Sequence, residues 1–143
     1  MARSKTLIDR TAFRPHKHGG VEGTFAVGGT RFECCVRIED ADVERAWANA
    51  ERVVRLVLDR FATIERRVRS DLAPNLDHWT AEKVSLAELT RRTVAAMRAS
   101  RTVVLNVTDT DSEAIFDGPD IALGHAVCVA VDKAGRVVSV GLA

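Results

Sequence analysis

Three residues near the end of the chain are candidates for a catalytic site. His125 follows Gly124 and precedes an apolar run, and Asp117 and Asp120 come a few residues before it. A histidine beside a carboxylate can act as a general base, because histidine changes its charge close to neutral pH. These three residues are the candidate catalytic groups. The alternative interpretation is a histidine that hydrogen-bonds beside a loop and holds the edge of a sheet.

A nucleophile to accompany His125 is not evident. Cys128 lies three residues further on, and residues three apart on a strand point to opposite faces, which disfavours a pair of the two. The chain contains no G-x-x-x-x-G-K-[ST], G-x-G-x-x-G, G-x-S-x-G or H-E-x-x-H motif. The sequence therefore does not identify a reaction. Its motifs favour a protein without enzymatic activity over an enzyme.

A second group of polar residues lies between residues 109 and 120. Its oxygens recur as in a calcium-binding loop, yet Ala114 stands where the sharp turn of such a loop needs glycine. We therefore expect a solvated acidic turn between two strands rather than a metal site. Trp79 lies in a loop between two predicted helices, either over the core or as an anchor for a partner. The candidate binding residues are Asp109, Asp111, Glu113, Trp79 and His125.

Length and composition indicate one globular domain. The 143 residues are 46% hydrophobic and 29% charged, and no apolar run reaches the roughly 18 residues of a membrane helix. The first residues carry an excess of arginine and lysine and end in glycines. We therefore expect residues 1–23 to be a flexible basic tail and residues 24–143 to form a single α+β domain.

The counts of particular residues bear on location and partners. Three cysteines, two of them adjacent, favour reduced thiols and a cytoplasmic protein, and the N-terminus lacks the apolar stretch of a secretory signal. A formal net charge of +1 and the absence of tyrosine argue against a nucleic-acid partner. No cofactor and no metal are expected, whereas a protein partner is.

Alternation of apolar and polar residues predicts the strands. Two β-prone runs joined by a glycine pair predict a hairpin over residues 24–39, with Cys34 on its core face and Cys35 on the other. A further strand is predicted over residues 102–107. Two more strands follow His125, joined by a tight Asp-Lys-Ala-Gly turn.

Helical periodicity predicts two helices. One apolar stripe covers residues 42–70 and is ended by Pro74. Ser85 followed by Glu88 is a capping-box signal for a second helix that runs to about Ala99. The predicted fold is α+β, an antiparallel sheet from the N-terminal hairpin and the C-terminal strands, with two helices packed on one face.

The C-terminal half resembles a group of small bacterial domains of unknown function. The features that carry the resemblance are Trp79, the helix start Ser85 to Leu89, the strand entry Gly124-His125 and the turn Asp132 to Gly135. It covers roughly residues 70–143, and the chain has Leu123 where the group tends to carry an aromatic residue. Some relatives are immunity-like, so the resemblance implies a protein-binding role that includes neutralisation of a toxin.

Two functional hypotheses follow from these observations. The first is a cytoplasmic, non-enzymatic protein-interaction module, of the immunity-like kind that the resemblance implies. The alternative is a small hydrolase or metal-dependent enzyme that uses His125 with Asp117 or Asp120. A homodimer is a further expectation, because the apolar stripe over residues 43–68 keeps a spacing close to a heptad repeat.

Overall fold

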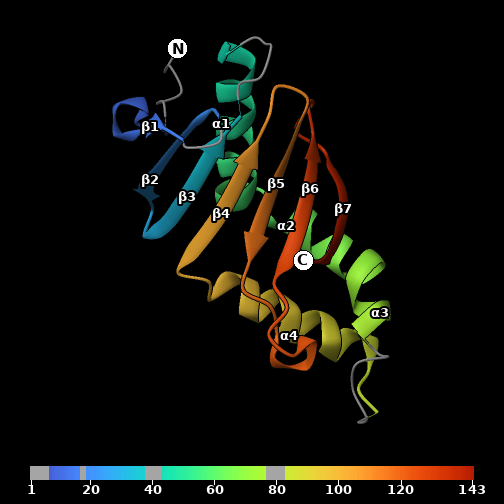
Figure 1. Cartoon of the computed structure of the whole chain (residues 1–143). Helices are drawn as coiled ribbons and strands as arrows, with labels where there is room; N and C mark the ends of the chain where they lie inside the picture. Colours follow the sequence, from blue (N-terminus) through green and yellow to red (C-terminus); the bar gives the residue numbers. More distant parts are fainter. Residues whose placement is uncertain (1–6, 17–18, 38–42, 77–82) are drawn as a thin grey trace.

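The chain folds around one seven-stranded sheet, with its helices between the third and fourth strands. The computed structural model describes residues 7–16, 19–37, 43–76 and 83–143. The strands lie side by side in chain order, from β1 to β7 (Figure 1). They are β1 Arg14–Pro15, β2 Val21–Val27, β3 Thr30–Val36, β4 Thr102–Val107, β5 Asp111–Phe116, β6 Val127–Asp132 and β7 Val137–Leu142. The expected α+β class is confirmed.

The sheet is mostly antiparallel, with one exception. β3 and β4 are parallel, and Cys34 of β3 lies opposite Leu105 of β4. The other neighbouring strands are antiparallel. The expectation of an antiparallel sheet is therefore wrong for this pair. A short hairpin joins two strands that run in opposite directions. The helices between β3 and β4 instead carry the chain back to the end of the sheet where β3 began, so β4 runs in the same direction as β3.

The N-terminal residues differ from the expected flexible tail. The side chain of Ile8 is only 4% exposed and belongs to the hydrophobic core. Phe13 packs edge-on against Trp47 with 4.8 Å between ring centroids, and Arg14 of β1 pairs with Glu22 of β2. Residues 7–16 thus belong to the folded domain. The basic side chains of this segment suggested a tail. The segment is nevertheless folded, because the few apolar residues between them are buried against the domain.

The long helix expected over residues 42–70 is divided. The structure has α1 Val43–Asp59, α2 Phe61–Arg67, a π-helical turn η2 Val68–Leu72 and α3 Ala73–Leu76. The predicted stripe is buried in both main parts, but Arg60 leaves helical geometry with φ −128°. Pro74 lies inside α3 rather than ending the helix. The wider π-turn directly before it accommodates a residue that has no N–H and crowds the preceding carbonyl groups.

Helix α4, Leu86–Arg98, begins as the sequence predicts. The backbone N–H of Glu88 donates to the hydroxyl of Ser85 at 3.1 Å, which satisfies one of the free donors of the first turn. Leu89 is buried, whereas Leu86 is 41% exposed. Among the described helices, none has the length and apolar character that a membrane span requires.

The stretch expected as an acidic turn contains strand β5. Its residues alternate, so that Ser112, Ala114 and Phe116 are buried while Asp111 and Glu113 lie on the opposite face. The cation-binding loop considered for this stretch is therefore ruled out, because a strand turns successive side chains to opposite sides. Cys34 is buried and Cys35 is half-buried on the other face, as predicted.

The two faces of the sheet differ in what covers them. The helices lie behind the sheet and leave its near side uncovered (Figure 1). On the covered side, Phe32, Val103, Leu105 and Val129 have at most 1% of their surface exposed. We call the other side the open face. It carries the outward residues of β2 to β6, from Glu22 to Asp132, and the described elements place no helix over it.

Candidate functional site

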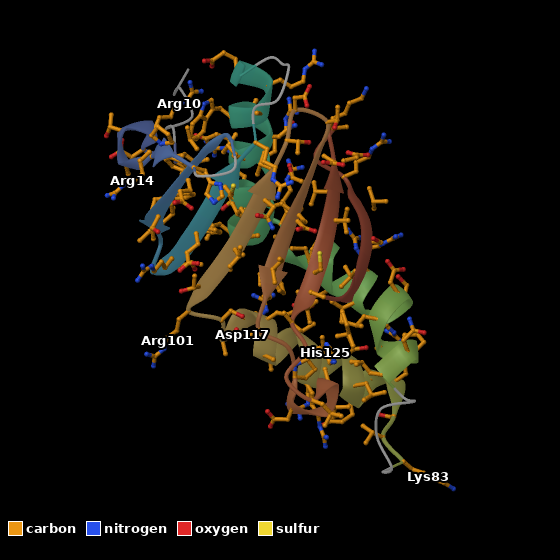
Figure 2. All side chains as sticks on the ribbon, viewed as in Figure 1. Arg10, Arg14, Lys83, Arg101, Asp117 and His125 are labelled. Atoms are coloured by element: carbon orange, nitrogen blue, oxygen red, sulfur yellow. The ribbon has the colours of Figure 1, made fainter. Side chains whose placement is uncertain are left out.

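The candidate residues named from the sequence do not converge on one site. Asp111 begins β5 and Asp117 follows its last residue, so the two lie about 20 Å apart along the strand. His125 lies with Asp117 at the lower end of the sheet in Figure 2. Asp109 lies at the other end, between β4 and β5. Trp79 lies outside the described residues.

His125 is exposed directly before β6. Its Nδ1 lies 3.2 Å from the backbone carbonyl oxygen of Ala143, beside the end of β7. Asp117 is held through its backbone, because its N–H donates to the hydroxyl oxygen of Ser100 at 2.9 Å. Asp120 begins the short 3-10 turn Asp120–Ala122. These contacts connect the loop ends to the sheet, which is what the structural interpretation of His125 requires.

The open face brings together residues that are distant in sequence. In one row across β3, β4, β5 and β6, the residues in register are Cys35, Asn106, Glu113 and Ala130. The adjacent row consists of Glu33, Val104, Ile115 and Cys128. The centre of the face is therefore apolar or neutral at Val104, Ile115 and Ala130, all half-buried.

Two hollows indent the open face. The first has a volume of about 540 Å³ and lies over β1 to β4. Its outward-pointing lining residues include Arg14, Glu22, Thr24, Glu33, Cys35 and Val104. The second, of about 460 Å³, lies towards the β4–β5 turn. Its lining residues include Arg37, Asn106, Asp111, Glu113, Asp132 and Val138. The face is thus shaped rather than flat.

The Glu113 carboxylate is held by two neighbours on the open face. Its Oε1 accepts the amide of Asn106 at 2.9 Å, and its Oε2 accepts the thiol of Cys128 at 3.3 Å. Burial raises the pKa of Cys128 to about 11, and the Glu113 carboxylate adds to that increase. The thiol consequently stays protonated at neutral pH and is a poor nucleophile.

Cys34 and Asp132 also have shifted pKa values. Burial raises the pKa of Cys34 to about 12, with a further contribution from Cys35. Backbone N–H donation from Arg136 lowers the pKa of Asp132, which stabilises the β6–β7 turn. Among the described residues, no three His, Cys, Asp or Glu side chains are placed to hold a metal ion.

Both outer edges of the sheet are closed to an added strand. On β7, the N–H of Val140 donates to Asp71 Oδ2 at 3.2 Å, and the carbonyl of Val138 accepts Arg67 Nη2. Arg67 and Asp71 form an ion pair at 2.9 Å, so the pair occupies the place of a neighbouring strand. At the other edge, β1 has two residues and includes Pro15, which has no N–H.

Comparison with known proteins gives no further guidance. No family model, no curated protein and no solved structure matches the chain.

Sequence reasoning missed the open face because it concentrated on the acidic stretch. It identified Asp111 and Glu113, which do lie there, but not Val104, Asn106 or Ile115. A signal for these residues exists. The alternation over residues 102–107 and 111–116 shows which side chains of each strand point away from the core. Only the pairing of the two strands shows that these side chains are adjacent.

The reactivity of Cys128 should report its contact with Glu113. We expect alkylation of Cys128 to be slow at neutral pH and to accelerate about tenfold per pH unit, because the thiolate fraction grows until the pH nears the raised pKa. Glu113→Gln removes the negative charge, lowers the pKa of Cys128 and should speed the reaction at neutral pH. Peptide-resolved mass spectrometry after iodoacetamide measures the rate. A rate unchanged in Glu113→Gln would contradict the contact.

Proposed function

We propose that this chain is a protein-interaction module that binds its partner on the open face of the sheet. The observation that carries the proposal is a sheet face with a half-buried apolar centre, at Val104 and Ile115, and with charges around it. Large uncovered faces of this composition are typical of sites where another protein docks. Charged residues beside the centre include Glu33, Arg37, Asp111 and Asp132.

The closed edges support docking on the face rather than at an edge. A partner that adds a strand needs a row of free backbone N–H and C=O groups. Arg67 and Asp71 engage such groups on β7, and Pro15 interrupts them on β1. The open face remains the surface of the sheet on which a partner can be accommodated without displacing a contact already made.

Of the hypotheses made from the sequence, the protein-interaction module agrees with this proposal and the enzyme is an alternative to it. Asp111 and Glu113 stay among the binding residues because they lie on the open face. The immunity-like role implied by the family resemblance is one form of the same function, with a toxin as the partner. The enzyme alternative uses His125 with Asp117 or Asp120, and the Nδ1 of His125 lies 3.2 Å from the backbone carbonyl oxygen of Ala143.

Site-specific photo-crosslinking tests the proposal. A benzophenone amino acid at Val104 places the probe in the centre of the open face, and the same probe at Leu86, exposed on α4, is the matched control. In cells of the source organism, the Val104 probe should form one dominant protein adduct that the Leu86 probe does not form. An adduct formed only from Leu86, or none from either position, would contradict the proposed face.

A further inference from the structure

We propose that the partner on the open face is a second copy of this chain, packed face to face about a two-fold axis that runs along the strands between β4 and β5. The inference rests on the proposed function and names its partner. Aligned sheets pack about 10 Å apart with their strands rotated by about 30°, so the register within one sheet determines which residues oppose each other.

Rotation about this axis reverses the order of the strands and keeps each residue at the same height along them. It brings β4 of one copy over β5 of the other, and β3 over β6. Because the two-fold relation makes the contact isologous, every pairing occurs twice. Such a contact requires a face that is complementary to itself.

The apolar centre matches itself. Val104 and Ile115 are in register on β4 and β5, so Val104 of one copy lies over Ile115 of the second. In the next row, Cys35 lies over Ala130, and Asn106 lies over Glu113. Half-buried apolar side chains therefore meet one another, and an amide meets a carboxylate.

The charges are also complementary. Arg37 directly follows β3, and Asp132 ends β6 in the row where Asp111 also lies. The exchange of β3 with β6 places Arg37 opposite Asp132 of the second copy. Glu33 lies over the thiol of Cys128, which the raised pKa keeps neutral. Among the described residues of β3 to β6, this arrangement sets no two like charges directly opposite each other, which avoids a repulsion that would oppose association.

The size of the face is sufficient for a weak to moderate dimer. The six strands β2 to β7 have six or seven residues at about 3.3 Å each and spacings of about 4.8 Å, so they make a face on the order of 500 Å². Standard interfaces bury roughly 800 Å² of accessible surface per partner, and a corrugated face has more accessible surface than its outline. We therefore expect a dimer that dissociates on dilution.

Sedimentation of the purified full chain is the first measurement. Over an about hundredfold range of concentration, the mass should approach twice the 15.6 kDa of one chain. Val104→Arg buries a charge in the centre of the contact and should raise the dissociation constant by at least about tenfold. Leu86→Arg, on the exposed side of α4, should leave it unchanged. A wild type that stays monomeric throughout, or equal effects of the two variants, would overturn the proposal.

Thiol cross-linking tests the register itself and does not depend on the folding of Val104→Arg. Cys35 and residue 130 of one copy are separated by three strand spacings, about 14 Å, beyond the reach of a bismaleimide of about 8 Å. In Ala130→Cys with Cys128→Ser, this reagent should give a covalent dimer that Cys35→Ser abolishes. Absence of the covalent dimer would overturn the register.

The two proposals fail separately. A monomeric protein whose Val104 probe captures a different protein overturns the second copy as the partner and supports the open face as a binding site. A monomeric protein without any Val104 adduct overturns both. An adduct of Val104 with another molecule of this chain supports both.

Discussion

Gly118→Ala is expected to lower the free energy of unfolding by about 3 kcal/mol and the melting temperature by roughly 10 °C. Gly118 lies in the loop between β5 and β6, and a Cβ at this position would lie 2.0 Å from the carbonyl oxygen of His125. The obstacle is backbone, which has no rotamer to change. The loop must move away from the entry of β6, where the pairing of Phe116 with Val127 begins.

A second glycine provides the matched control. Gly141 of β7 has nothing within 4 Å of where its Cβ would be. Gly141→Ala should therefore change the melting temperature little, and alanine even has the smaller entropy cost of folding. Thermal unfolding followed by circular dichroism measures both variants. Similar effects of Gly118→Ala and Gly141→Ala would show that the close approach of residues 118 and 125 is not important for stability.

Trp47→Ala is expected to have the largest effect, a loss of about 3–5 kcal/mol in the free energy of unfolding. Trp47 is 6% exposed on α1, and it contacts Phe13 on one side. The guanidinium of Arg10 lies 4.9 Å from the centroid of its ring and also pairs with Glu44 at 2.9 Å. The ring thus connects the N-terminal segment to the helix layer.

The loss should be concentrated in that segment. Hydrogen exchange in Trp47→Ala should increase most in residues 7–16 and β2, while β4 to β6 keep their protection relative to the lowered global stability. Trp47→Phe retains an aromatic ring and should recover a large part of the loss. Uniform loss of protection over the whole sheet would contradict a specific role of Trp47 in holding residues 7–16.

Elements with local signals could be predicted from the sequence. The cap at Ser85, the hairpin of β2 and β3 and the limits of β4 are confirmed, because each depends on residues only a few positions apart. The assignment of Cys34 to the core and Cys35 to the opposite face is also confirmed, since alternation along one strand requires no knowledge of its neighbours.

Which segments become neighbours could not be predicted, because it depends on long-range packing. The interruption at Arg60, the parallel pairing of β3 with β4, and β5 within an acidic stretch follow from packing against other elements. The candidate site shows the same limit. Asp111 and Glu113 were identified from their chemistry, whereas their adjacency to Val104, Asn106 and Cys128 arises from strand pairing. Periodicity gives the direction of each side chain, but a surface is defined by the contacts among several strands, and these are non-local.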